Sequence, residues 1–474
     1  MTNFSRGDLA TAAPTARRTA LATVAFACLA MMASYLPFSA ANGALGRVAA
    51  ATGAGTADLQ WVTDAFAVAL SVTVLSAGAL AERYGRRRIT VLGLLLTVVG
   101  SLADVAAGTL DGLTTIHLLW AGQALAGVGA GLVMSATLAL IAATASSTAA
   151  RTRAISLWAA AVVVGLGAGP FLVAAVMTAL DWYWSFAPIA AIALGTLVFG
   201  ISRSSESLGS SERALDLPGQ VTGALGIAAL AFGAITGGTT GWASLTALLA
   251  FALAAVSSTL FVVIEHRSVS PVLSPLLFRS PRFVAAGVAA AVVLFAIAGD
   301  IFVLSLFFSS QHLDGLGIAV RLGGIFLGNL VASLAAGGIQ LRLGGPRVLV
   351  GGLLIGAAGM ASLLGVQGDS AFLDLFWRLV VFGFGCGLVM ATSSAVAIHS
   401  VTGSLAGMAG AANNALRQLG AALGPAVLGV FVGVQLGLGG SYLDAVHAVA
   451  AVLAALFAAV AILTVTLSQA NQNH

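Results

Sequence analysis

The residues of this chain whose types could do chemistry are the few ionisable side chains that interrupt its long apolar runs. Asp300 lies inside the apolar run 284–308, and Arg321 lies near the start of the next run, 317–341. A carboxylate surrounded by hydrocarbon is costly, so Asp300 is expected to face a polar interior, to stay protonated or to pair with a cation. The two residues therefore predict either a proton-coupling or substrate-binding site, or a structural ion pair.

Two further polar positions lie inside apolar runs. Asp64 is one turn into the run 59–81, where a surface or packing role and a functional role are equally open. Arg417 lies about two turns into the run 409–435, with Asn413 one turn earlier on the same helix face. Arg417 either snorkels to the membrane interface or gives the interior a fixed positive charge that tunes a nearby carboxylate.

The densest charge cluster, at residues 78–88, reads GALAERYGRRR and separates the runs 59–81 and 89–108. A segment so basic and so short cannot lie in hydrocarbon. It predicts a tight hairpin between two membrane helices, and its arginines place it on the cytoplasmic side. The segment is either a topology anchor or a latch between two helix bundles, and its acidic residue can pair with the arginines or cap a helix end. We call this segment the gate loop, with candidate residues Gly78, Glu82, Arg83, Gly85, Arg86, Arg87 and Arg88.

The composition identifies the elements that must position these residues. Hydrophobic residues make up 59% of the 474 residues and charged residues only 8%, which no soluble domain of this size can accommodate. The chain is therefore predicted to be an all-α polytopic membrane protein. The net charge of +4 reflects arginines in short loops near an anionic membrane surface, and nucleic-acid binding is not expected. No metal-ligand spacing, phosphate-binding loop or catalytic triad is present, so neither an enzyme nor a metal or cofactor is expected.

Fourteen apolar runs predict fourteen transmembrane helices. Most arginines fall in loops that are cytoplasmic if both chain termini are cytoplasmic, and this bias supports the helix count. The predicted organisation is a cytoplasmic tail 1–18, a six-helix half 19–202, a linker 203–282 with two extra helices and a cytoplasmic loop, a second six-helix half 283–467 and a cytoplasmic tail 468–474.

An internal repeat decides this division. Residues 127–134 read GVGAGLVM, and residues 383–390 read GFGCGLVM. A degenerate copy of the gate loop recurs at nearly the same offset, with Gly337 in the place of Gly78. Two parallel six-helix halves with an inserted helix pair are the expected build of an alternating-access transporter with its binding site between the halves.

A second repeated pattern could shape a moving helix. Gly165, Gly169 and Pro170 form a G-x3-G-P pattern that recurs at 420–425. Proline kinks a helix, and glycines four residues apart let a neighbouring helix pack closely. The pattern therefore predicts either a helix that flexes during transport or a purely structural contact.

These motifs together resemble those of the fourteen-helix drug:proton antiporter family of the major facilitator superfamily. The gate loop matches the family pattern G-x-L-x-D-R-x-G-R-R except that Glu82 replaces Asp. The resemblance covers nearly the whole chain and implies the fold and an export role, for which the glycine–proline pattern is typical. It also rests on the segments LQWVTDAF at 59–66, GLGAGP at 165–170, WYWSF at 182–186 and NNALRQLG at 413–420.

The chain departs from that family at two charged positions. Pro37 stands where the family has a helix-1 aspartate, although Asn42 of the same motif is kept, and Gln123 stands where the family has a helix-4 arginine. The loss of both removes an acid–base pair that the family associates with coupling or substrate charge. The resemblance then leaves proton coupling to Asp300, Asp64 or Glu82 and disfavours cationic drugs.

The sequence thus predicts a secondary transporter that exports hydrophobic small molecules, such as an antibiotic, a drug or a toxic metabolite, and draws on the proton gradient. It is expected to be a monomer in a bacterial cytoplasmic (inner) membrane, with protons, lipid and a hydrophobic substrate as its partners. Uptake by symport or facilitated diffusion is one alternative, and a non-transporting sensor or assembly partner is the other.

Overall fold

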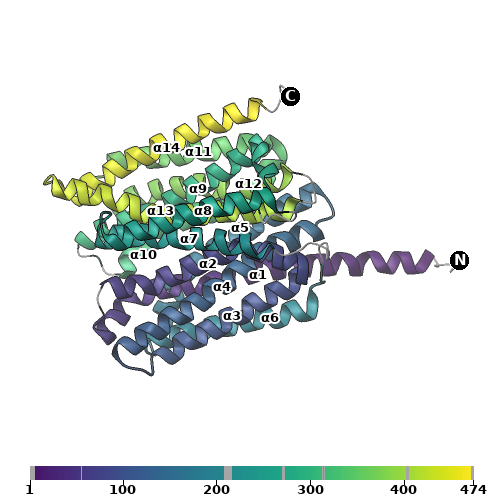
Figure 1. The fold of residues 1–474 in the computed structure, drawn as a ribbon, viewed down its shortest axis with the longest axis horizontal. Coiled ribbons are helices and arrows are strands. Elements are labelled where there is room, and N and C mark those ends of the chain that lie inside the picture. The colour runs from purple at the N-terminus through teal and green to yellow at the C-terminus, as the bar shows by residue number, and fades with distance from the viewer. Residues whose placement is uncertain are drawn as a thin grey trace.

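The structure is a computed structural model that describes residues 6–54, 56–207, 216–268, 273–311, 313, 315–401 and 405–470 (Figure 1). Over these residues every regular element is helical. The long helices are α1 Arg6–Thr52, α2 Thr56–Tyr84, α3 Arg86–Ala107, α4 Gly112–Thr144, α5 Thr148–Val176, α6 Phe186–Arg203, α7 Leu217–Thr240, α8 Leu245–Arg267, α9 Pro281–Ser310, α10 Gly315–Leu343, α11 Gly345–Ser362, α12 Phe372–His399, α13 Ala406–Gly437 and α14 Tyr442–Ala470. Short 3-10 helices are η1 Trp182–Ser185, η2 Pro275–Arg279 and η3 Leu363–Gly365.

Each predicted apolar run forms one of these helices. Among the described residues, 13 helices are long and apolar enough to cross a membrane as they stand. The remaining helix, α2, reaches that length as two pieces, Trp61–Val74 and Ser76–Tyr84, which meet at a bend of 55°. The start of α1 extends beyond the helix bundle as the purple helix in Figure 1, so helix begins within the segment predicted as a tail.

The repeated glycines place α4 between α2 and α3. The Cα of Gly127 lies against the backbone of Phe66 on α2, and that of Gly129 lies against Gly93 on α3, so closely that a Cβ at either glycine would overlap the neighbouring carbonyl oxygen. Small residues at such contacts let helices approach closely where lipid offers no hydrophobic driving force.

The second half repeats this packing. Gly383 lies against Ile325 on α10, and Gly385 lies against Gly356 on α11, again without room for a Cβ. Helix α12 therefore sits between α10 and α11 as α4 sits between α2 and α3. This arrangement confirms the predicted pair of six-helix halves.

The G-x3-G-P pattern forms an equivalent contact in each half. On α5, a Cβ at Gly165 or Gly169 would overlap the backbone of α1, and Ser39 of α1 donates a hydrogen bond to the Gly165 carbonyl at 2.8 Å. On α13, Gly420 and Gly424 lie equally close to the backbone of α9. The pattern thus fixes the pairs α1–α5 and α9–α13.

Gly169→Ala is expected to destabilise the protein by about 1–3 kcal/mol, the usual cost of an overpacked core. The added methyl group overlaps Ser39 Oγ and the Ala40 amide, which cannot move without shifting α1. The thermal unfolding midpoint of the purified protein in detergent would measure the loss. Gly195→Ala on α6 is the matched control, because nothing lies within 4 Å of its Cβ position. Equal midpoints for the two variants would contradict the prediction.

The two halves meet through α2 against α13 and α5 against α10. A Cβ on Gly78 would lie 3.2 Å from that of Ala411 on α13, and one on Gly337 would lie 3.1 Å from Ser156 Oγ on α5. These two glycines hold the same place in the two copies of the gate-loop motif. The halves therefore touch through equivalent small residues near the gate-loop side of the bundle.

The inserted pair packs across one of these seams. Helix α7 contacts both α2 and α13, and α8 packs on α7 (Figure 1). The Phe232 ring of α7 lies 5.5 Å from that of Trp61 at the start of α2, centroid to centroid. The insertion thus covers the α2–α13 seam at the end of α2 away from the gate loop.

Candidate functional site

A buried cation lies between the helices of the second half. The Arg417 side chain of α13 is only 1% exposed. Its Nη1 donates to Ser394 Oγ on α12 at 3.3 Å and to Asn414 Oδ1 at 3.1 Å, and its Nε has no partner among the described residues. The interpretation that Arg417 snorkels to the interface is therefore wrong. Its charge lies inside the bundle with neutral partners.

The polar groups around Arg417 reach the first half. Asn413 is fully buried, and its Nδ2 lies 3.5 Å from Ser394 Oγ. Gln418, which directly follows Arg417 on α13, donates from Nε2 to the Tyr35 hydroxyl of α1 at 3.2 Å. We call Tyr35, Ser394, Asn413, Asn414, Arg417 and Gln418 the central polar cluster.

Apolar and soft side chains surround the α1 end of the central polar cluster. The Tyr35 ring lies 6.0 Å from that of Phe66, which in turn lies 5.2 Å from that of Phe38. The Met134 sulfur of α4 is 4.0 Å from Gln418 Nε2. Aromatic rings and methionine beside a few polar groups suit ligands that are mostly apolar.

Asp300 is buried in α9, close to the helices that carry the cluster. It is 2% exposed, and its Oδ2 has no hydrogen-bond partner among the described residues. The preceding residue, Gly299, has its Cβ position 2.9 Å from the Gly424 carbonyl oxygen of α13. On another side, Asp300 acts electrostatically on Cys386 of α12. The carboxyl group therefore lies where α9, α12 and α13 meet.

Arg321 does not pair with Asp300. Its guanidinium carbon lies 5.9 Å from the ring centroid of Phe308 and 5.7 Å from that of Phe372, and its Nη1 donates to the Gly317 carbonyl at 3.2 Å. These contacts hold Arg321 at the end of α9, two turns beyond Asp300. The structural ion pair considered from the sequence is therefore wrong, whereas the Asp374–Arg378 pair is present on α12 at 3.0 Å.

Two other predicted site residues lie in α1 and α2. Asp64 is half-buried, one turn after Trp61. Asn42 is exposed, and its Nδ2 donates to the Phe38 carbonyl of its own helix at 2.9 Å.

Gln123 leads to an acidic residue that sequence reasoning missed. Its Nε2 donates to Asp104 Oδ2 on α3 at 2.7 Å and lies 3.5 Å from the Pro37 carbonyl oxygen on α1. Gln123 and Asp104 are fully buried. Asp104 lies near the end of its apolar run, so it reads as a loop residue. The sequence did offer one indication that Asp104 is buried. Asp104 lies 18 residues after Arg86, or about 27 Å along a helix, and a residue at that distance is still inside the membrane-spanning part of the helix.

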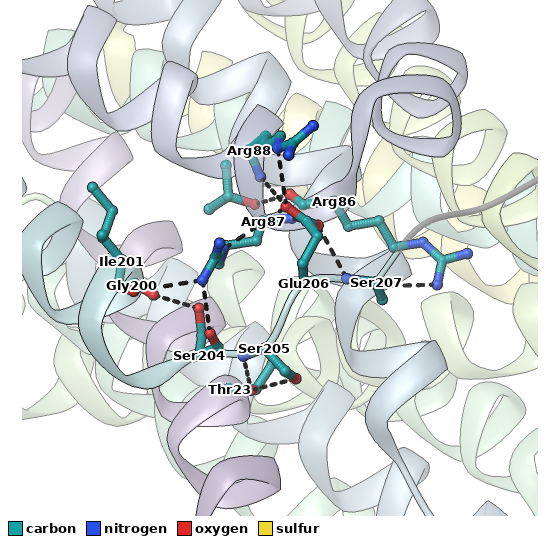
Figure 2. A network of polar contacts seen from close by, with 11 residues as sticks. Thr23, Arg86, Arg87, Arg88, Gly200, Ile201, Ser204, Ser205, Glu206 and Ser207 are labelled. Atoms are coloured by element: carbon teal, nitrogen blue, oxygen red, sulfur yellow. Dashed lines mark hydrogen bonds and ion pairs between the residues drawn. The ribbon is translucent and has the colours of Figure 1, made fainter. Parts of the chain in front are cut away.

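The gate loop is built around a carboxylate from the linker (Figure 2). Gly85 separates α2 from α3 with a φ of 105°, a left-handed conformation that favours glycine. Glu206 accepts hydrogen bonds from the amides of Arg87 at 3.0 Å and Arg88 at 3.2 Å, and it lies 3.8 and 3.9 Å from their Nε atoms. A Cβ on Gly85 would lie 2.8 Å from the Glu206 carboxyl carbon. Glu206 thus caps the N-terminus of α3, where a negative charge is favoured.

Neighbouring linker residues extend this network. The Arg86 amide donates to the Ser207 carbonyl at 3.2 Å, and Arg87 Nη1 donates to the Ser204 carbonyl at 3.1 Å (Figure 2). The Ser205 amide donates to Thr23 Oγ1 on α1 at 3.3 Å. These bonds of Arg86 and Arg87 therefore join the gate loop to the start of the linker and thus to its own half.

The other gate-loop residues complete this picture. Arg83 is exposed, and its guanidinium carbon lies 5.6 Å from the Tyr84 ring centroid. Glu82 is half-buried and acts electrostatically on Arg86. At this loop, Gly78 lies against Ala411 of the second half.

Two repeated six-helix halves around a buried polar cluster are the architecture of many secondary membrane transporters. The sequence model of the Major Facilitator Superfamily matches residues 27–425, and the chain belongs to this family. The protein is accordingly a multi-pass membrane transporter and not an enzyme.

Several curated relatives are resistance proteins. The chain is 27% identical over 413 residues to the methylenomycin A resistance protein of Bacillus subtilis, covering 85% of this chain and 86% of the relative. It is 29% identical to the multidrug resistance protein Stp of Mycobacterium tuberculosis, covering 87% and 76%. It is 26% identical to the tetracenomycin C resistance and export protein of Streptomyces glaucescens, covering 81% and 70%.

A solved structure shares the fold. The human organic anion transporter MFSD10 (TETRAN) aligns over 95% of this chain and 99% of its own, with a TM-score of 0.68 and 17% sequence identity. This likeness supports the assignment of the fold.

Proposed function

We propose that the protein exports hydrophobic small molecules by alternating access in exchange for protons. The observation that carries this proposal is Asp300, a carboxyl group that is 2% exposed at the junction of α9, α12 and α13 and has no counter-cation bonded to it. A carboxylate is costly at such a place, so Asp300 takes up a proton when buried and releases it when water reaches it. The G-x3-G-P contact beside it supplies a helix pair whose separation would admit that water.

The substrate class follows from the central polar cluster and from the relatives. A few polar groups beside Tyr35, Phe38, Phe66 and Met134 suit a mostly apolar molecule with some hydrogen-bonding groups. The names of the relatives include resistance to methylenomycin A, export of tetracenomycin C and multidrug resistance. Methylenomycin A and tetracenomycin C are therefore the first compounds to test, together with the neutral, apolar dye Nile red.

The setting of this activity is part of the proposal. The protein acts as a monomer in a bacterial cytoplasmic membrane, with both termini on the cytoplasmic side, as the arginine distribution favours. The proton gradient supplies the energy, and no cofactor or nucleic acid takes part. The binding site between the two six-helix halves is closed alternately on the gate-loop side and on the opposite side of the membrane.

Asp300→Asn is expected to abolish export, because an amide keeps the shape of the carboxyl group but cannot carry a proton. Accumulation of the three compounds would be measured in an efflux-deficient bacterium that produces wild-type protein, Asp300→Asn or neither, with and without a protonophore. Asp369→Asn, at an exposed position outside α11 and α12, is the matched control and should export like the wild type.

The same experiment separates the alternatives. Lower accumulation with the wild type, lost on adding the protonophore or on Asp300→Asn at equal protein levels, is the expected result. Higher accumulation with the wild type would indicate uptake instead. Accumulation equal to that of the vector for all compounds would favour a narrower substrate or a sensor that transports nothing. Export that survives Asp300→Asn would move proton coupling to another residue.

A further inference from the structure

A second buried carboxyl group lies in the first half, at the meeting point of α1, α3 and α4. Asp104 and Gln123 both have 0% exposed surface, and the Gln123 Nε2 is shared between Asp104 Oδ2 at 2.7 Å and the Pro37 carbonyl oxygen at 3.5 Å. The glycine next to Gln123, Gly122, leaves the space that Asp104 occupies, since a Cβ there would overlap Asp104 Oδ1.

Asp104 and Gln123 together lack one hydrogen-bond donor. Asp104 Oδ1 and Gln123 Oε1 are both buried, both accept hydrogen bonds, and neither has a partner among the described residues. The buried Ser101 hydroxyl, one turn earlier on α3, also lacks a partner. A protonated carboxyl group has a hydroxyl donor, whereas a carboxylate has none. A proton on Asp104 would therefore let the acid donate to the amide oxygen while the amide donates to the acid.

The charges around Asp104 do not replace that proton. Hydrogen bonding from Gln123 is the one polar influence that acts on the carboxyl group, and no cation of the described residues acts on it. Nearby titratable groups on the elements that pack on α3 lie elsewhere: His117 of α4 is exposed and packs on Trp120, and Tyr183 of η1 lies against Gly108. The others on or beside these elements include Tyr35 and Arg47 of α1, Asp58 and Asp64 of α2, Asp111 before α4, Asp181 before η1 and Arg203 of α6, and, at the gate-loop end, Glu82, Arg83, Arg86, Arg87 and Arg88. A lone carboxylate in such an apolar interior is strongly disfavoured.

We propose that Asp104 is a proton-binding site that carries its proton in this conformation, with Gln123 as the residue that positions it. Asp104 lies about 27 Å along α3 from Arg86, and therefore at the opposite end of the helix from the gate loop. Separation of α3 from α4 would expose the pair to water and allow the proton to leave. This proposal rests on the proposed function only in that the proton then serves coupling; the protonation itself does not depend on any substrate.

Infrared spectroscopy of the purified protein in lipid tests protonation without a transported compound. The carbonyl-stretch band of protonated carboxylic acids would be recorded across neutral and alkaline pH for wild type, Asp104→Asn and Asp300→Asn. Asp104→Asn is nearly isosteric, and its amide can both accept from and donate to Gln123, so the fold is retained. We expect one component of the band, present at neutral pH, to be missing in Asp104→Asn and present in Asp300→Asn. An unchanged band in Asp104→Asn overturns the proposal.

A transport measurement then tests whether that proton is used. Tetracenomycin C efflux from vesicles would be driven by an imposed pH gradient, or by the tetracenomycin C gradient alone, with wild type and Asp104→Asn. We expect Asp104→Asn to lose the response to the pH gradient and to keep downhill tetracenomycin C movement. A full response to the pH gradient in Asp104→Asn overturns the coupling role. If the wild type moves no tetracenomycin C, the proposed export of this compound fails, whereas the infrared result still decides the protonation of Asp104.

The role of Gln123 can be separated from simple packing. Gln123→Leu keeps much of the side-chain volume but removes the amide, so Asp104 loses its hydrogen-bond partner. We expect the Asp104 infrared component to remain and to shift in frequency, because its hydrogen bonding has changed. An Asp104 component with the wild-type frequency in Gln123→Leu would overturn the positioning role of Gln123.

Discussion

Arg417→Met is expected to reduce export at least about tenfold while the protein remains as stable as the wild type or more so. The guanidinium is 1% exposed, its Nη1 partners are neutral, and its Nε has no partner among the described residues. Replacing a buried charge by an apolar side chain of similar volume is often neutral or stabilising by about 1–4 kcal/mol. The thermal unfolding midpoint in detergent and the rate of tetracenomycin C efflux would be measured on the same preparation.

This pairing of readouts separates a functional charge from a structural one. Arg267→Met is the matched control, because Arg267 is exposed at the end of α8, away from the central polar cluster and the gate loop, and its loss should change neither quantity. Arg417→Lys keeps the positive charge, but its shorter side chain ends before the Nη1 position that bonds Ser394 and Asn414, so we expect intermediate export. A marked fall in the unfolding midpoint of Arg417→Met, or export at the wild-type rate, would show that the charge serves stability alone.

Glu206→Ala is expected to have the second large effect, at the gate loop. The variant loses two charge-assisted hydrogen bonds to the Arg87 and Arg88 amides at the N-terminus of α3. Each such bond contributes about 1.5–3 kcal/mol when buried, and the Glu206 side chain is 21% exposed, so a combined loss of about 2 kcal/mol is expected. That energy corresponds to a shift of about thirtyfold in the population of this conformation.

The loss would be measured as the tetracenomycin C efflux rate and as the rate of tryptic cleavage at the arginines of the gate loop. We expect slower efflux and faster cleavage in Glu206→Ala. Glu206→Gln retains one acceptor and should lie between Glu206→Ala and the wild type. Asp369→Ala removes an exposed carboxylate from another loop and should behave as the wild type. Unchanged cleavage in Glu206→Ala would contradict the proposed role of the carboxylate in holding the loop.

Much of the fold could be predicted from the sequence because it depends on glycines whose spacing repeats. Gly127 and Gly383 belong to matching octapeptides, and each packs its helix on an equivalent partner, α2 or α10. Close helix contacts in a membrane require small residues, so the repeat in sequence becomes a repeat in packing. The inserted pair was likewise visible as extra apolar runs. Its position across the α2–α13 seam could not be predicted, because neither run carries a pattern that specifies a partner.

The candidate site was only partly predictable, since a sequence gives the depth of a residue along its helix but not the direction in which it points. Depth alone allowed Arg417 to snorkel, yet its helix turns it towards Ser394. Depth also allowed Arg321 to meet Asp300, yet the aromatic rings of Phe308 and Phe372 hold it two turns away. For Arg417 the rotation of its helix about its axis decided the contact, and for Arg321 the packing of its guanidinium on two aromatic rings decided it.

Two acidic residues were missed for a related reason. Asp104 stands near the end of an apolar run and Glu206 stands in a polar linker, and acidic residues in such places are usually solvated. Their partners, Gln123 and the amides of Arg87 and Arg88, are distant in sequence or belong to the backbone. A carboxylate that caps a helix from another segment leaves no local sequence pattern.

Cys386 packs in α12 beside Asp300, and its thiol is buried. The other cysteine, Cys28, is half-buried in α1. A thiol reacts with maleimides only after water and reagent reach it, and the reaction is irreversible. If the proposed opening admits water to Asp300, we expect the rate of covalent modification at Cys386 to rise with the frequency of that opening, so the native chain carries a thiol with which the opening can be measured without an added label site.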